Sequence, residues 1–222
     1  GGMPAAARAM WCVAGVNPDT NVVVGGDHEM NLGTGFGEGQ IAYRNTSGSW
    51  VSVNAGVLPG PIPFGIRHLS TPDGQFYYAV GEASSSAFGG WGLARSTDAG
   101  HTWTQHAQVY TTPPPNVLYW GVQFIDASNG WAVGSAGTII HTTDSGTNWV
   151  KQAVPGAVSN TVFRSVFFTS STNGFVVGQG GVILTTTNGG TTWIQQTSDS
   201  TEDLHSVYFP DSTNGWIVGK NG

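Results

Sequence analysis

Few side chains in this chain of 222 residues are able to do acid–base or ionic chemistry. Lys and Arg together number 7, Asp and Glu number 13, and charged residues make up 9% of the sequence, against about 25% in an average globular protein. The net charge of −6 removes the attraction to phosphates that dominates nucleic-acid binding. The composition therefore excludes a basic nucleic-acid-binding module, a charge-rich disordered tail and a coiled coil.

The residue types that bind metals or cofactors do not occur at useful spacings. Asp27, His28 and Glu29 are potential ligands, but three consecutive residues seldom converge on one ion. The other histidines lack the spacing of a zinc site, and Gly33-Thr34-Gly35 lacks the following helix that a dinucleotide-binding loop requires. Cys12 is the one cysteine and cannot form an internal disulfide. The sequence predicts no metal, no cofactor and no catalytic residue.

One motif, Ser/Thr-x-Asp/Asn-x-Gly-x-x-Trp, recurs along the chain and is typical of a turn. Its carboxylate or amide oxygen accepts backbone N–H groups, its glycine adopts a conformation that a Cβ disfavours, and its Trp packs between neighbouring repeats. Asn replaces Asp in two copies, which favours hydrogen bonding over catalysis. We interpret these residues as structural: Asn45, Trp50, Asp98, Gly100, Trp103, Asp144, Gly146, Trp149, Asn188, Gly190 and Trp193.

The motif belongs to a longer repeat. Gly130, Gly174 and Gly215 each follow an Asn and are 44 and 41 residues apart, a period typical of propeller blades. Apolar residues alternate with small or polar ones, as in Val122 and Phe124, which predicts strands with one buried face. We expect each Asn-Gly pair to supply a positive φ at a tight connection between strands.

Four strands per repeat predict an all-β protein, a β-propeller of four-stranded antiparallel blades. The chain holds about 4.5 of these units, and a closed propeller needs four to eight. We therefore expect one domain over residues 1–222 that is part of a ring of six to eight blades and is incomplete at its C-terminus. The expected blades cover residues 10–54, 64–106, 118–152 and 162–196, with a partial blade at 204–222.

The full repeat reads Phe-x-Asp/Ser-x-x-x-Gly-Trp-x-Val-Gly, then Gly-x-Ile, then Thr-Thr-Asp/Asn-x-Gly-x-x-Trp. It resembles the Ycf48/HCF136-like family of photosystem II stability and assembly factors, within the Asp-box or BNR-repeat superfamily of sialidase-like propellers. The likeness is strongest over residues 118–222 and degenerate over 10–106. It implies a seven-bladed, non-enzymatic propeller on the lumenal or periplasmic side of a membrane, which holds assembling protein subunits.

That family is described by an arginine-bearing face. Arg67 and Arg164 lie near the first strands of their units, where other units carry Trp120 and His205. Scarce charge with abundant Ser, Thr, Asn and Gly also fits an extracytoplasmic protein, and no apolar run is long enough to span a bilayer. We expect a protein-interaction, assembly or cell-surface module with a protein partner.

Two other functions remain open. Sialidases share the Asp-box, so a carbohydrate-binding or glycoside-hydrolysing propeller with a glycan ligand is the first alternative. Their Arg-Ile-Pro motif is absent, and Ile66-Arg67-His68 is the nearest sequence. The second alternative is a structural subunit of an extracellular or membrane-associated assembly.

Long loops in the first two units mark a hypothetical partner-binding surface. We expect the loops between second and third strands to lie on the same face as the connections between blades, and loops of such length in a compact repeat fold are usually functional or disordered. The hypothesis names Asp27, His28, Glu29, Glu38, Glu82, Phe88, Trp91 and Tyr110, with Arg67 and Arg164.

Overall fold

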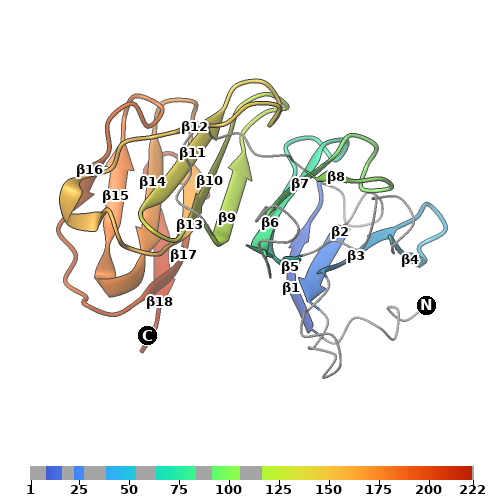
Figure 1. Cartoon of the computed structure of the whole chain (residues 1–222), viewed down its shortest axis with the longest axis horizontal. Coiled ribbons are helices and arrows are strands. Elements are labelled where there is room, and N and C mark those ends of the chain that lie inside the picture. The colour runs from blue at the N-terminus through green and yellow to red at the C-terminus, as the bar shows by residue number, and fades with distance from the viewer. Residues whose placement is uncertain are drawn as a thin grey trace. The chain divides into compact units, whose positions relative to one another are not determined.

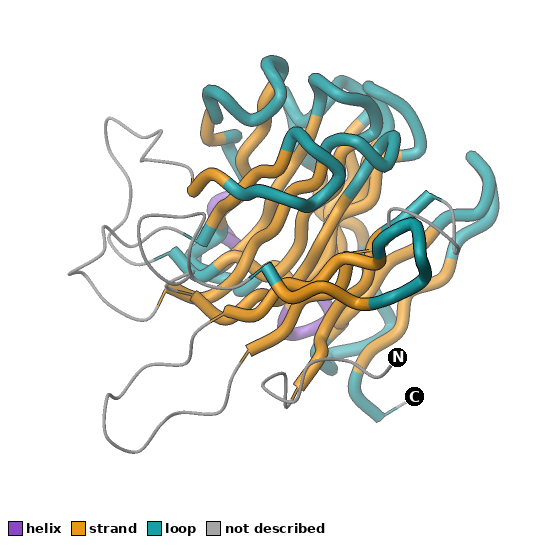
Figure 2. The backbone as a smooth tube through the Cα atoms, turned by 90° about the vertical axis from the view of Figure 1, so that its right-hand side faces the viewer, coloured by secondary structure: helices purple, strands orange, loops and turns teal. Residues whose placement is uncertain are grey.

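The computed structural model describes residues 9–16, 23–27, 39–53, 64–83, 92–105 and 117–221. Strands and turns dominate these ranges (Figures 1 and 2), and their helical content is limited to two 3₁₀ turns, η2 (Gly156–Val158) and η3 (Gln179–Gly181). The predicted all-β class is confirmed. The chain divides into two compact units, residues 1–109 and residues 110–222, and each is described by itself.

The first unit contains two four-stranded antiparallel sheets, in which strands that follow each other in sequence also pair. Residues 45–49, 71–76 and 97–103 form described turns of these meanders. The first sheet is made of β1 (Ala9–Ala14), β2 (Val23–Asp27), β3 (Gly39–Arg44) and β4 (Trp50–Ser52). The second is made of β5 (Phe64–Ser70), β6 (Tyr77–Ala83), β7 (Leu93–Ser96) and β8 (Thr104–Gln105).

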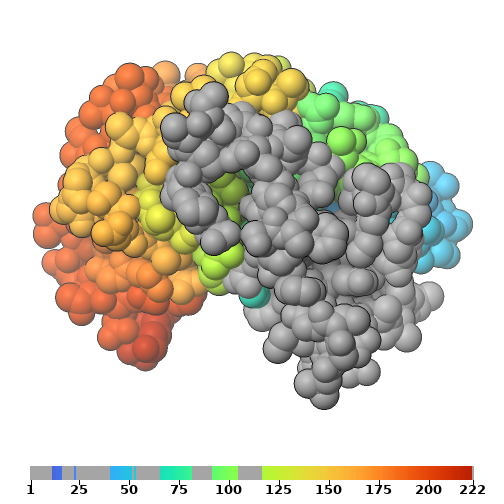
Figure 3. All heavy atoms as spheres, viewed as in Figure 1, coloured from blue at the N-terminus to red at the C-terminus, as the bar shows by residue number. Residues whose placement is uncertain are grey.

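The second unit repeats this meander in two sheets and ends with a two-stranded one. The third sheet of the chain, which is the first of this unit, is made of β9 (Tyr119–Phe124), β10 (Gly130–Gly134), β11 (Thr138–Thr142) and β12 (Val150–Lys151). The fourth is made of β13 (Phe163–Phe168), β14 (Gly174–Gly178), β15 (Ile183–Thr186) and β16 (Ile194–Gln196). The last pair is β17 (Leu204–Tyr208) and β18 (Trp216–Gly219), and the red C-terminal end of the chain beyond them lies at the bottom of this unit in Figures 1 and 3.

The core of each unit lies between successive sheets. In the first unit, Val23 and Ile41 of one sheet pack with Ile66 of the next. In the second unit, Trp131 of β10 joins Phe163 and other residues of the following sheet in one buried cluster. The fourth sheet is apolar on both faces, since Val176 belongs to the cluster shared with the third sheet and Val177 to the cluster shared with β17 and β18. Such a sheet is stable only when stacked, as the blades of a propeller are.

The glycines of the Asn-Gly pairs do not adopt the predicted positive φ. Gly130 and Gly174 both lie outside the left-handed region, so that prediction was wrong. A Cβ at Gly130 would stand 2.5 Å from the ring of Phe124, and one at Gly174 would stand 2.4 Å from the ring of Phe168. Glycine is needed here because an aromatic ring of the neighbouring strand covers its Cα.

Candidate functional site

The first strand of every sheet carries one extra residue at the same place. In β13, Phe163 pairs with Gly178 and Ser165 pairs with Val177, so Arg164 between them has no partner in the ladder. Such a bulge turns a side chain out of the regular alternation, and bulges are common next to functional sites. We call the five extra residues the bulge residues: Trp11, Arg67, Trp120, Arg164 and His205.

A glycine at the end of each second strand makes room for the bulge in the second unit. A Cβ at Gly134 would lie 2.3 Å from the carbonyl oxygen of Leu118, and one at Gly178 would lie 2.4 Å from that of Val162. The residue after each glycine donates its backbone N–H to the same carbonyl. The Val-Gly pair that recurs in the repeat is therefore the sequence signal of the bulge, and sequence analysis did not recognise it.

Two bulge residues of adjacent sheets contact each other in the second unit. The guanidinium carbon of Arg164 lies over the ring of Trp120, 4.7 Å from its centroid, which is a cation–π arrangement. The strands approach closely because Gly121 has no side chain, and a Cβ there would meet the carbonyl oxygen of Arg164 at 2.9 Å. The side chain of Arg164 is 19% exposed.

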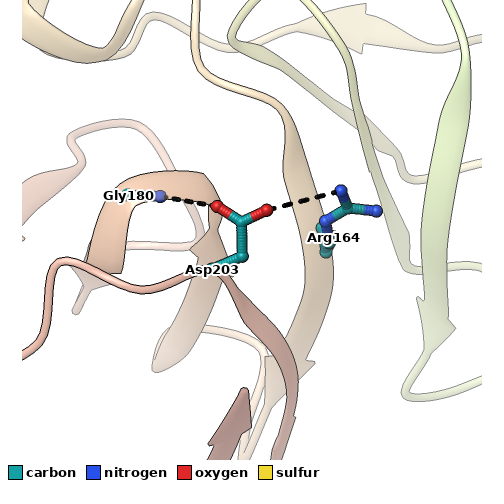
Figure 4. Close-up of polar contacts among 3 residues, drawn as sticks. All are labelled: Arg164, Gly180 and Asp203. Atoms are coloured by element: carbon teal, nitrogen blue, oxygen red, sulfur yellow. Dashed lines mark hydrogen bonds and ion pairs between the residues drawn. The ribbon is translucent and has the colours of Figure 1, made fainter. Parts of the chain in front are cut away.

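Asp203, just before β17, faces Arg164 (Figure 4). Its Oδ2 lies 3.7 Å from Nη2 of Arg164, and its Oδ1 accepts the backbone N–H of Gly180 at 3.1 Å. Within the described ranges, no hydrogen-bond acceptor reaches Nε of Arg164, which is buried. Arg164 therefore has donors that its surroundings do not use.

The third bulge residue of this unit, His205, has an exposed side chain. Its strand β17 lies beside β13, and Oγ of Ser165 accepts the backbone N–H of Val207 at 3.3 Å. The strands β9, β13 and β17 thus bring Trp120, Arg164 and His205 from three successive sheets to equivalent strand positions. We call Trp120, Arg164, Asp203 and His205 the Arg164 cluster.

The hypothetical partner-binding surface is only partly described. His28, Glu29, Glu38, Phe88, Trp91 and Tyr110 lie outside the described residues, and only the backbone of Asp27 and Glu82 is described. Arg67 and Arg164 are both bulge residues. The backbone of Glu82 pairs with Gly65, two residues before Arg67. Sequence analysis missed Asp203 altogether, because it precedes its strand and belongs to no motif.

The Asp-box residues lie in turns between third and fourth strands. In the third sheet, Oδ1 of Asp144 accepts the hydroxyl of Thr142 at 2.8 Å and the backbone N–H of Asn148 at 2.7 Å. The backbone N–H of Gly146, at φ 75°, donates to the Thr142 hydroxyl at 3.0 Å. The copies at Asp98 and Asn188 repeat the pattern, and Asn45 accepts two backbone N–H groups.

The tryptophans that follow these turns are buried, except in the first copy. Trp103, Trp149 and Trp193 are 2, 3 and 4% exposed, whereas Trp50 is half-buried. Trp193 packs in the cluster with Trp131 of the preceding sheet, and its Nε1 donates to Oε1 of Gln152 at 3.1 Å. The turn thus fastens one sheet to the one before it.

The aspartates of these turns are acceptors rather than acids. For Asp98 and Asp144, partial burial would raise the pKa, but hydrogen bonds from their turns outweigh it and lower the pKa. Asp126, in a turn between first and second strands, has its pKa lowered in the same way. In the described part of the chain, no three His, Cys, Asp or Glu side chains are placed to hold a metal ion.

A family model described as photosynthesis system II assembly factor YCF48 matches residues 102–201 and 157–222. The two overlapping matches cover more than half of the sequence. The chain belongs to this family. No curated protein sequence matches it. Among the residues that the structure describes, no helix is long and apolar enough to cross a membrane.

Several solved structures share the propeller fold. YCF48 bound to D1 peptide has a TM-score of 0.57 and 19% identity, over 76% of this chain and 54% of that one. YCF48 from Cyanidioschyzon merolae has a TM-score of 0.61 and 17% identity, over 95% and 66%. A Niastella koreensis GH74 enzyme has a TM-score of 0.64 and 16% identity, over 92% and 32%. This chain therefore spans between half and two thirds of the length of the two YCF48 chains.

Proposed function

We propose that this protein is a non-enzymatic propeller that binds a segment of a partner protein through the Arg164 cluster. The observation that carries the proposal is the partly exposed guanidinium of Arg164, held 4.7 Å from the Trp120 ring centroid and 3.7 Å from the Asp203 carboxylate. Membership of the YCF48 family and the description of one solved YCF48 as bound to a peptide support it.

The chemistry of the cluster favours an anionic segment. A guanidinium presents its N–H donors in a planar fork that matches a carboxylate. An aromatic face beside the guanidinium restricts the directions in which these donors point. Trp120 adds apolar surface on which a neighbouring side chain of the partner could pack. The expected ligand is a peptide that carries carboxylates next to apolar residues.

The family description as an assembly factor supports a role in holding partner subunits, outside the cytoplasm. The low charge of the chain, 9% of residues, fits such a location. Because the chain spans only part of the known YCF48 structures, the identity of the partner and any link to photosynthesis are parts of the proposal. Export of a tagged full-length protein from its native host would test the location.

A binding assay tests the proposed function. The probe is a fluorescently labelled peptide of alternating Glu and Leu residues, and the matched peptide carries Gln in place of Glu. Arg164→Gln should weaken binding of the acidic peptide about ten-fold, which is the typical loss of affinity when one charge-assisted hydrogen bond is removed. Lys151→Gln removes the same charge from an exposed outer strand and should leave binding unchanged. Equal affinity of wild type and Arg164→Gln would contradict the proposal.

We also propose that the five sheets belong to a larger ring of six to eight blades. On the last sheet, Trp216 is 60% exposed and Val218 is 58% exposed. Their equivalents in the third sheet, Trp131 and Val133, are 1% and 0% exposed, since the neighbouring sheet covers them. A further blade would cover Trp216 in the same way. A crystal structure in which these five sheets alone close a ring would contradict this proposal.

A glycoside-binding or hydrolysing function is the second candidate, favoured by the likeness to the GH74 enzyme. Glycoside hydrolysis uses two carboxyl groups, one of which has a raised pKa. Asp98, Asp126 and Asp144 have lowered pKa values, so they do not fit that role. Another solved GH74 structure of similar fold is described as a xyloglucanase. Incubation with xyloglucan and analysis of the released sugars would therefore decide, and release that depends on one carboxylate would favour the enzyme.

A further inference from the structure

We infer that the carboxylate of Asp203 competes with a ligand carboxylate for the guanidinium of Arg164. This competition limits how strongly the cluster binds the ligand. In the free protein the Asp203 carboxylate partly neutralises the guanidinium, and an incoming carboxylate has to share or displace it. The inference rests on the proposed function and names the residue that limits the affinity of that site.

The contact between the two side chains is long for an ion pair. Nη2 of Arg164 and Oδ2 of Asp203 are 3.7 Å apart, whereas a charge-assisted hydrogen bond between such groups is about 2.7–2.9 Å long. Asp203 therefore lowers the positive potential at Arg164 without occupying its donors. Nε of Arg164 is buried, and the side chain as a whole is 19% exposed, so a ligand carboxylate would meet the terminal Nη groups, one of which faces Asp203.

Asp203 is held in place by groups other than Arg164. Its Oδ1 accepts the N–H of Gly180 at 3.1 Å, and its backbone carbonyl accepts the N–H of Lys220 at 2.8 Å. A Cβ at Gly219 would lie 2.3 Å from that same carbonyl oxygen, so the backbone of Asp203 fits closely against β18. The carboxylate thus stands near Arg164 whether or not the guanidinium attracts it.

Two consequences follow for a peptide that binds Arg164. Its carboxylate would stand close to that of Asp203, and two like charges in one site repel. The site as a whole also carries one positive and one negative charge, so long-range attraction of an acidic peptide is weak. Asp203 makes the cluster selective for peptides that add apolar contact to the carboxylate.

The test replaces Asp203 by Asn, which keeps an oxygen for the Gly180 N–H and removes the charge. The probe is the labelled Glu-Leu peptide, and its dissociation constant is measured by fluorescence anisotropy at low salt. We expect Asp203→Asn to bind about three-fold or more tightly than wild type, as expected for removing one like charge at a partly exposed site. High salt should reduce the gain.

Two further variants keep the test specific. Glu202→Gln removes the same charge from the preceding residue and should leave affinity near the wild-type value. The double variant Arg164→Gln, Asp203→Asn should bind no better than Arg164→Gln, because the competitor acts only through Arg164. Thermal unfolding of each variant checks that the fold is retained.

Weaker or equal binding by a folded Asp203→Asn would overturn the inference. Weaker binding would make Asp203 a positioning residue that holds the guanidinium, and equal binding would give it no part in recognition. If neither wild type nor Asp203→Asn binds the acidic peptide at all, the proposed function fails first. Loss of binding in Arg164→Gln together with no gain in Asp203→Asn would retain the proposed function and reject the competitor.

Discussion

The ring of Phe168 covers the Cα of Gly174 and leaves 2.4 Å for a Cβ. On its other side, Phe168 stacks on Trp131 of the preceding sheet, with ring centroids 3.6 Å apart and planes 13° from parallel. A glycine on one strand thereby sets the position of a ring on which the preceding sheet packs. The glycine of the repeat is a packing residue for the stack of sheets.

Gly174→Ala should destabilise the protein although alanine is the smallest change available. The added methyl would push the Phe168 ring against Trp131, and overpacking of this kind costs about 1–3 kcal/mol. We expect a lower midpoint of urea unfolding. Gly156 is the control, because a Cβ there would meet nothing within 4 Å. Gly156→Ala should unfold as wild type does, and equal stability of the two variants would contradict the packing argument.

Gln152→Ala should loosen the fourth sheet from the third. Oε1 of Gln152 accepts the indole N–H of Trp193 at 3.1 Å, and its Nε2 donates to the carbonyl of Gly189 at 2.8 Å. Truncation leaves the buried indole N–H without its acceptor, which costs about 1–3 kcal/mol. Urea unfolding followed by tryptophan fluorescence measures the loss. Gln195→Ala, on an exposed strand position, should have no effect; an equal loss there would point to a general effect of removing glutamine.

The repeat predicted the strands well because its alternation records which face is buried. Val122 and Phe124 are buried as the pattern requires. The role of Gly174 was not predictable in the same way, since Asn-Gly is also the usual signal of a turn. Only the position of the Phe168 ring distinguishes the two roles.

The candidate site was less predictable than the fold. Arg164 was named from its sequence position, but its contacts with Trp120 and Asp203 join residues 44 and 39 positions away. Arg164 and Trp120 occupy equivalent bulges on neighbouring strands. The propensities of Trp and Arg do not predict where a strand forms a bulge. The loop hypothesis, which includes His28 and Glu38, stays a prediction because these residues lie outside the described part of the chain.

His141 should make the protein less stable in mild acid. Its ring stacks on Trp131 at 4.4 Å, its Nε2 is buried without an acceptor among the described residues, and burial lowers its pKa. The unfolded chain therefore takes up the proton more readily, so stability falls as pH drops below about 6.5.

His141→Gln removes this titration and should flatten the pH dependence between about pH 7.5 and 5.5. Urea unfolding at both pH values measures the slope. His205→Gln is the control, since this side chain is exposed, and it should keep the wild-type slope. An unchanged slope in His141→Gln would show that another group causes the acid sensitivity.

Asp144 should respond to acid in a lower pH range and should tolerate Asn better than Ala. Burial would raise its pKa, but hydrogen bonds from Asn148 and Thr142 outweigh that effect, and the pKa is lowered. A carboxylate with a depressed pKa stabilises the fold above its unfolded value near 3.9, and the contribution is lost as pH falls through the folded value. Asp144→Ala removes the turn's acceptor and should cost about 1 kcal/mol at neutral pH.

Asp144→Asn keeps Oδ1 for the Asn148 N–H, as Asn188 does for Thr192 in the next sheet. We expect this variant to lose less stability than Asp144→Ala at neutral pH and to converge with wild type as the pH falls below the unfolded value and through the lowered pKa of Asp144. Asp199→Asn, at an exposed position, controls for the change in net charge. A gap between Asp144→Asn and wild type that stays constant from neutral to acid pH would show that the charge of Asp144 does not contribute.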